Sequence, residues 1–215
     1  MPISNSCSAT SEETGDSFLY FAFGSNLLTD RIHINNPSAK FLDVAKLDGY
    51  QLEFNYFSKR WRGAAATVNP VTQAQTSPEP PSPGEASYGG SAIDGGVSGP
   101  GHVWGVLWQL RREDISNLDS QEGVQVSTCG ANIGVYRPLQ VPVLRRSTGE
   151  RVVARTYQLI KPREKDRRPS KVYIDVIKKG AIENGLPKEY LDFLSNIEHN
   201  GYNSDVDLEL NLSKV

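Results

Sequence analysis

The sequence predicts an α+β fold built on a small mixed, strongly curved β-sheet. Alternating and apolar segments typical of strands fill the first two-thirds of the chain, and amphipathic segments typical of helices fill the last third. Outside one long segment of low complexity, the 215 residues leave enough sequence for one domain of about 150–170 residues. We therefore expect a single domain over residues 17–200, interrupted by an insert at 70–101.

The first element is an apolar run, FLYFAF at 18–23, that stops at Gly24-Ser25-Asn26. A short run rich in aromatic residues is typical of a strand buried on both faces. Glycine can take backbone angles closed to other residues, and Ser and Asn suit a turn or a helix start. The pattern predicts a strand end with free backbone N–H groups, which can hold a carboxylate or an oxyanion. Many such strand ends bind nothing, so spacing alone leaves both interpretations open.

The next segments predict one helix and three strands. A short helix is expected at 27–36, ended by Asn-Asn-Pro. Residues 39–58 alternate well enough for two strands around Asp48-Gly49, a dipeptide typical of hairpin turns. GAAATV at 63–68 predicts a short strand whose small residues allow close backbone approach.

Composition changes sharply at residues 70–101, which are dominated by Pro, Gly, Ser and Ala. Such a segment cannot bury enough apolar area to offset its chain entropy, so we predict a disordered loop between two strands. A spacer role is favoured over a regulatory or binding role. The polar residues 1–16 predict a flexible tail, and 201–215 a second one. Within the second tail, 206–212 alternate by two, which leaves an edge strand as the alternative.

The second half of the chain begins with a clear strand pattern, HVWGVLWQL at 102–110, followed by a short helix at 111–123. Pro138 and Pro142 place the strand that contains them at a sheet edge or beside bulges. The remaining elements are a strand pair at 133–145 and 151–160, then amphipathic helices at 169–185 and 186–201, closed by Gly185 and Gly201.

Composition excludes several classes of function. The formal net charge of −2 provides no basic field for nucleic acid or an anionic membrane, and no apolar run reaches membrane length. Cys7 and Cys129 indicate neither a disulfide framework nor a zinc site, and the histidines lack metal-ligand spacing. Nucleophile-elbow, P-loop and dinucleotide motifs are absent. We expect a cytoplasmic protein with no cofactor, no metal, no nucleic-acid partner and no membrane contact.

One carboxylate is a candidate for proton transfer. On the 111–123 helix, Ile115, Leu118 and Glu122 fall on one face, whereas Asp119 falls on the outer face. The acids in the first turn are explained by the helix dipole. A Glu on a buried face is desolvated, and its pKa should rise toward the range useful for acid–base work. The alternative is a Glu that turns to the surface or caps a neighbouring N–H, and geometry alone weighs the two evenly.

A tyrosine on the 169–185 helix is a second candidate. Tyr173 shares a face with Val176, Ile177 and Gly180 and is therefore directed inward near the helix start. Taken alone, this pattern favours a core tyrosine with its hydroxyl at the rim.

Three segments, in this order, resemble the γ-glutamylcyclotransferase superfamily. FAFGSNL resembles the YGSNL signature, whose loop binds the γ-glutamyl part of the substrate, although Phe23 stands where the family usually has Tyr. LDSQEGV resembles the LDxQEGV segment that carries the catalytic acid/base, which implies this role for Glu122. PSKVYIDVIKKGAIENGLP resembles the helix ending GAKENGLP, in which the Tyr at the place of Tyr173 contacts the substrate.

The resemblance implies a small β-barrel flanked by helices, a homodimer, and cyclisation of γ-glutamyl amino acids or dipeptides to 5-oxoproline and a free amino acid. One alternative is a sister activity on γ-glutamyl-ε-lysine or glutathione, and another is a non-catalytic binding protein that keeps the fold. Besides Glu122, the implied substrate-binding residues are Tyr20, Phe21, Ala22, Phe23, Gly24, Ser25 and Tyr173, with Asn26 and Tyr136 as further candidates.

Overall fold

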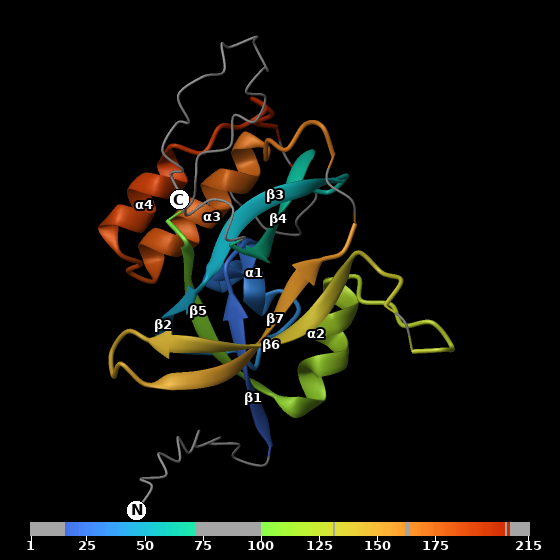
Figure 1. Ribbon diagram of the computed structural model, residues 1–215, viewed down its shortest axis with the longest axis vertical. Helices are drawn as coiled ribbons and strands as arrows, with labels where there is room; N and C mark the ends of the chain where they lie inside the picture. The colour runs from blue at the N-terminus through green and yellow to red at the C-terminus, as the bar shows by residue number, and fades with distance from the viewer. Residues whose placement is uncertain (1–15, 72–99, 131, 162–163, 205, 207–215) are drawn as a thin grey trace, which may run out of the picture.

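Five strands close into a barrel at the centre of the molecule (Figure 1). The computed structural model describes residues 16–71, 100–130, 132–161, 164–204 and 206. The barrel is closed by a parallel pairing between Tyr20 and Arg155, and its other strand pairs are antiparallel. The α+β class and the strongly curved sheet are thus confirmed. In order around the barrel, the strands are β1 (Ser17–Ala22), β5 (His102–Arg111), β2 (Lys40–Asp48), β6 (Tyr136–Arg145) and β7 (Arg151–Leu159).

A separate two-stranded ribbon consists of β3 (Tyr50–Ser58) and β4 (Gly63–Pro70). The expectation of a hairpin around Asp48-Gly49 is wrong, because β2 pairs with β5 and β6 while β3 pairs with β4. The chain does turn there, with Gly49 at φ +75°, but it passes from the barrel into the ribbon.

The ends of the 70–101 insert meet at Gly49. Gly49 donates its backbone N–H to Gly101 O over 3.1 Å, and its carbonyl accepts from Val71 N over 2.9 Å. A long insertion between β4 and β5 is therefore compatible with the sheet, since its two ends are held together and loop closure costs little. The predictions for 1–15, for most of the insert (72–99) and for 207–215 lie outside the described residues.

The helices are shorter than the sequence patterns predicted. The expected helix at 27–36 is a 3₁₀ turn, η1 (Ser25–Leu27), and a short α1 (Thr29–His33), separated by the extended Leu28. The 111–123 segment forms η3 (Arg112–Asp114) and α2 (Ile115–Gln121). No helix of the described residues is both long and apolar enough to cross a membrane.

The two C-terminal helices are α3 (Lys171–Glu183) and α4 (Lys188–Ser195), which lie side by side next to the ribbon in Figure 1. Ser170 caps α3 by accepting from Tyr173 N over 3.2 Å, and Gly185 follows its end at φ +67°. The expectation that the last helix reaches Gly201 is wrong. It stops at Ser195, where Ser195 and Asn196 side chains bond the carbonyls of Leu191 and Asp192.

The second half of β1 lies in the core. Its burial rises along the strand, and Phe21 and Ala22 are fully enclosed. This matches the expectation of a buried strand drawn from its unbroken apolar run. The largest fully buried side chains come from the barrel and the helices around it: Trp108, Tyr157, Phe21, Leu27, Leu28, Ile32, Leu47, Leu107, Leu110, Leu118, Ile174 and Ile177.

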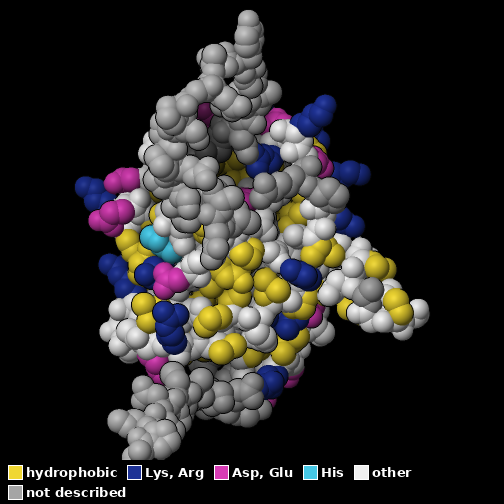
Figure 2. All heavy atoms as spheres, in the orientation of Figure 1, with side chains coloured by type: hydrophobic (Ala, Val, Ile, Leu, Met, Phe, Trp, Pro, Cys, Tyr) yellow, Lys and Arg dark blue, Asp and Glu magenta, His cyan; other side chains and the backbone are white. Residues whose placement is uncertain are grey.

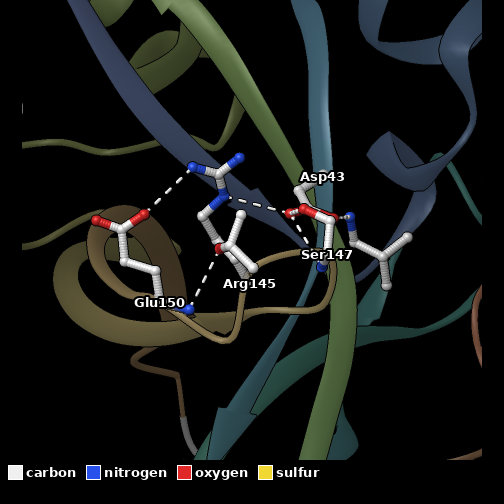
Figure 3. A network of polar contacts seen from close by, with 6 residues as sticks. Asp43, Arg145, Ser147 and Glu150 are labelled. Atoms are coloured by element: carbon white, nitrogen blue, oxygen red, sulfur yellow. Dashed lines mark hydrogen bonds and ion pairs between the residues drawn. The ribbon is translucent and has the colours of Figure 1, made fainter.

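A polar network closes the barrel where β2 meets β6 (Figure 3). The ladder between these strands has only two paired positions, at Leu144 and Arg145 of β6, so Pro138 and Pro142 lie in the part of β6 that pairs with β7 alone. Buried Asp43 on β2 accepts from Arg145 Nε over 3.2 Å and from the Ser147 hydroxyl, and Arg145 also pairs with Glu150. Burial alone would raise the pKa of Asp43, but these hydrogen bonds outweigh it and lower the pKa. Side chains thus strengthen a short backbone ladder.

Apolar side chains gather on the side of the barrel that faces the viewer, over β6 and β7 (Figure 2). Val153 of β7 is among the exposed apolar residues, at 58% of its full exposure. This face of the barrel therefore offers an apolar surface to solvent.

Candidate active site

The end of β1 and the end of α2 meet in one polar cluster. Asn26 Nδ2 donates to the Tyr20 hydroxyl over 3.1 Å and to Glu122 Oε1 over 3.3 Å. Trp108 Nε1 donates to Asn26 O over 3.0 Å, which holds the loop against the barrel. Two motifs that lie 96 residues apart in the sequence are therefore in direct contact.

Glu122 stands directly after α2, where its N–H still donates to Leu118 O over 3.1 Å. Leu118 is fully buried, and Glu122 is half-buried on the same side. Burial is the main reason why the pKa of Glu122 rises from 4.5 to about 7, and the charge of Asp119 raises it further. The positive charges of Arg31 and Arg60 lower the pKa of Glu122. At neutral pH such a carboxyl group can both accept and donate a proton.

Asp119 does not lie on an outer face, contrary to the sequence-based expectation. Its carboxylate pairs with Arg155 Nη2 of β7 at 2.6 and 2.7 Å and accepts from the Tyr157 hydroxyl. The periodicity identified the apolar face around Leu118 but not the charged partner on the barrel beside it. The ion pair fixes α2 against the barrel and thereby sets the position of Glu122.

Two tyrosine hydroxyls flank the backbone of Ala66 in the ribbon. The Tyr136 hydroxyl donates to Ala66 O over 2.9 Å, and Ala66 N donates to the Tyr173 hydroxyl over 3.3 Å. The Tyr173 ring packs on Trp61 with centroids 4.4 Å apart. Burial raises the pKa of both tyrosines, and the charge of Glu122 contributes in the same direction, so both hydroxyls stay protonated. The small side chain of Ala66 allows this approach, as the sequence predicted.

Gly24 lies next to the Tyr173 hydroxyl. Its φ is −109°, so the loop does not use a conformation reserved for glycine. A Cβ at this position would instead lie 3.3 Å from the Tyr173 oxygen, close enough that the Tyr173 side chain would have to shift by a few tenths of an ångström. Within the described residues, the backbone N–H groups of Gly24 and Ser25 have no backbone acceptor, and the turn's bonds begin with Leu27 N to Gly24 O at 3.0 Å.

The predicted binding residues of β1 do not all reach this cluster. Tyr20 belongs to it through Asn26. Phe21 has no exposed surface, and its carbonyl accepts from the Thr156 hydroxyl over 2.9 Å, so the structure places it in the barrel interior. Ala22 is also fully buried, and Phe23 is 7% exposed. The structure thus brings together Tyr20, Gly24, Asn26, Glu122, Tyr136 and Tyr173.

Arg31 is a charged neighbour that the sequence reasoning missed. It lies on α1 with only 7% of its surface exposed, and its Nε has no hydrogen-bond partner among the described residues. Burial lowers its pKa, as does the charge of Arg60, while Glu122, Tyr20 and Tyr173 raise it. In the sequence it is one basic residue in the last turn of a short helix, a position that usually needs no further explanation.

The same cluster offers no donor set for a metal ion. Within the described residues, no three His, Cys, Asp or Glu side chains come close enough together to hold one. Its polar groups are one carboxyl, two arginines, tyrosine hydroxyls and an amide.

The closed barrel thus carries a half-buried carboxyl group of raised pKa beside an N–H-rich loop and protonated tyrosines, an arrangement suited to acid–base chemistry. The AIG2-like family model matches residues 102–194. The chain is 37% identical to gamma-glutamylcyclotransferase of Mus musculus, with 96% of this chain and 93% of the mouse protein covered. Against the Homo sapiens protein of the same name, identity is 36% with 91% and 86% covered.

A solved structure of a gamma-glutamyl cyclotransferase superposes with a TM-score of 0.68 at 36% identity, covering 90% of this chain and 95% of that one. The chain belongs to the gamma-glutamylcyclotransferase family. The barrel flanked by helices that the sequence resemblance implied is confirmed.

Proposed function

We propose that this enzyme cyclises γ-glutamyl amino acids or dipeptides to 5-oxoproline and releases a free amino acid, with Glu122 as acid/base. The observation that carries the proposal is the Glu122 carboxyl, with its pKa near 7, held 3.3 Å from the Asn26 amide of the loop. The relatives named gamma-glutamylcyclotransferase support the reaction type.

In this reaction the α-amine of the substrate attacks its own γ-carbonyl carbon. A new C–N bond closes the five-membered lactam, and the C–N bond to the leaving amine breaks. The attacking nitrogen loses two protons as it changes from the α-ammonium to the lactam N–H, and the leaving nitrogen gains two as it changes from the amide N–H to the released ammonium. Glu122 takes the first proton before the attack and gives it to the leaving nitrogen as the C–N bond breaks. It then takes the second proton from the new lactam nitrogen and passes it to the released amine, so protons balance without water. Holding the two ends of one molecule together can be worth about 7–11 kcal/mol, and general acid–base catalysis adds about 10²–10⁴-fold.

The loop supplies the donors for the developing oxyanion. The N–H groups of Gly24 and Ser25, which lack a backbone acceptor among the described residues, are available for the γ-carbonyl oxygen. The protonated hydroxyl of Tyr173 lies next to Gly24 and can donate to the same oxygen. Phe23 supplies no hydroxyl where the family usually has one, so Tyr173 and the backbone have to carry this role.

The test is release of 5-oxoproline from γ-glutamyl-alanine, γ-glutamyl-ε-lysine and glutathione. We expect turnover of γ-glutamyl-alanine, and Glu122→Gln should bind it without turning it over. A matched control is Glu113→Gln, because Glu113 is exposed on the same segment. No 5-oxoproline from any of the three would favour the non-catalytic alternative, and preference for one of the other two would favour a sister activity. Undiminished turnover by Glu122→Gln would refute the mechanism.

We also propose that the protein is a cytoplasmic homodimer. The composition supports the cytoplasmic location. The family resemblance supports the homodimer, and the apolar surface over β6 and β7 is available for an interface (Figure 2). Sedimentation equilibrium on the full chain distinguishes a dimer from a monomer.

A further inference from the structure

Two buried polar atoms beside Glu122 lack partners among the described residues. One is an acceptor, Oδ1 of Asn26, and the other is a donor, Nε of Arg31. Both residues are only 7% exposed, so leaving these atoms unpaired costs free energy that a ligand can recover. An unpaired acceptor and an unpaired cationic donor together match a ligand that carries an ammonium group and a carboxylate.

The charges around Glu122 point to the same ligand. Asp119 is already paired with Arg155, so it leaves no free anion for Arg31. Arg31 interacts electrostatically with Glu122, but also with a second cation, Arg60, which lowers its pKa. The cluster therefore has more positive than negative charge whenever Glu122 is protonated, and it should attract an anionic ligand.

The chemistry of the substrate fixes where a carboxylate must lie. In a γ-glutamyl group, the α-carboxylate and the α-amine are bonded to the same carbon. If the amine gives its proton to Glu122, the α-carboxylate is brought close to that second carboxylate. Such an approach is unfavourable in a buried site unless a cation lies beside both groups. Arg31 is the buried cation that interacts with Glu122.

We propose that Arg31 binds the α-carboxylate of the γ-glutamyl group and makes the enzyme select substrates that carry it. This inference rests on the proposed function. The guanidinium donates from Nε to the carboxylate, while Asn26 Oδ1 accepts from the neighbouring amine and directs it to Glu122. Arg31 is thus a specificity residue common to all γ-glutamyl substrates, since the leaving group plays no part in the contact. The product, 5-oxoproline, keeps the carboxylate and is held in the same way.

The first test compares two lactams by calorimetry on the full chain. 5-Oxoproline carries the carboxylate, and 2-pyrrolidinone is the same ring without it. The wild-type protein should bind 5-oxoproline about 10- to 100-fold more tightly, as expected for charge-assisted hydrogen bonds. Arg31→Gln should lose this preference. The control Arg62→Gln removes an exposed cation from the same molecule and should keep it.

The second test uses turnover of two amides, γ-glutamyl-alanine and 4-aminobutanoyl-alanine, which lacks only the α-carboxylate. Wild type should favour the first in kcat/KM, and Arg31→Gln should treat the two nearly alike. If wild type turns over γ-glutamyl-alanine but does not discriminate within either pair, the role of Arg31 is refuted while the proposed function stands. If wild type turns over neither amide, the proposed function itself fails.

Arg31→Lys covers the case in which Arg31→Gln does not fold. It keeps the charge but not the planar donor set, so it should retain part of the preference for 5-oxoproline. The wild-type comparison of the two lactams needs no variant and can overturn the proposal by itself, because the proposal requires that 5-oxoproline binds more tightly than 2-pyrrolidinone.

Discussion

The raised pKa of Glu122 predicts that the fold loses stability as pH rises, and that Glu122→Gln removes this loss. Its pKa is about 7 in the folded protein against the ordinary value of 4.5, so between these values the folded state holds a proton that the unfolded state has lost. The contribution of the protonated Glu122 carboxyl group to the stability is complete below about pH 4.5 and is lost as pH rises through about 7. Gln is neutral at every pH and has almost the same shape.

The size of the effect follows from the two pKa values. A difference between about 7 and 4.5 corresponds to about 3 kcal/mol when the carboxyl is fully ionised. We therefore expect the stability of Glu122→Gln, relative to wild type, to increase from pH 5 to pH 8.5 by about 2–3 kcal/mol. In a chain of this size each kcal/mol corresponds to roughly 2–4 °C in Tm.

Urea denaturation followed by tryptophan fluorescence at pH 5, 6, 7, 8 and 8.5 measures the difference, with Glu113→Gln as the exposed control. The comparison uses only how the difference changes with pH, so a constant cost of burying an amide does not affect it. A difference that stays flat over this range would show that the Glu122 carboxyl is not desolvated. The acid–base role would then lose its physical basis.

Three further predictions concern Asp119, Ser170 and Gly24. Asp119→Asn removes a charge that raises the pKa of Glu122 and breaks the pair with Arg155, so the kcat/KM profile should shift to lower pH and urea denaturation should show a loss of about 1–3 kcal/mol. An unchanged pH profile would contradict this. Ser170→Ala removes the cap of α3 and should cost about 1 kcal/mol, seen as a fall in Tm. Gly24→Ala puts a methyl group 3.3 Å from the Tyr173 hydroxyl and should lower kcat/KM about tenfold in the 5-oxoproline assay, whereas full activity would show that this contact does not matter.

Local patterns predicted the elements well because strand and helix periods depend on neighbouring residues. β5 and β7 lie within a residue or so of the expected ranges, and α3 begins at Lys171, within two residues of the expected start at 169. The local patterns did not predict correctly which strands pair with each other. A turn signal such as Asp48-Gly49 reverses the chain locally but does not decide between a hairpin and a change of sheet. The partners of β2 are β5 and β6, and both lie beyond the ribbon and the insert in the sequence.

The site shows the same difference between features that neighbouring residues determine and contacts between distant segments. Helical periodicity placed Glu122 beside buried Leu118, and the structure agrees. It misplaced Asp119, because the partner that draws this carboxylate inward is on β7. Arg31 was missed for a related reason. Its neighbours come from β1, the end of α2 and α3, and no single window of sequence contains them.

The opposing influences on Glu122 explain how one carboxyl group can serve at two stages of the reaction. Arg31 and Arg60 oppose the effect of burial and keep the pKa of Glu122 near 7, so part of the enzyme holds the carboxylate form that accepts a proton. A substrate carboxylate bound to Arg31 would neutralise the cation that favours this charged form. The pKa of Glu122 then rises in the complex, and the proton taken from the α-ammonium stays on Glu122 until the leaving nitrogen can receive it. Substrate binding itself would thus change Glu122 from a base into an acid.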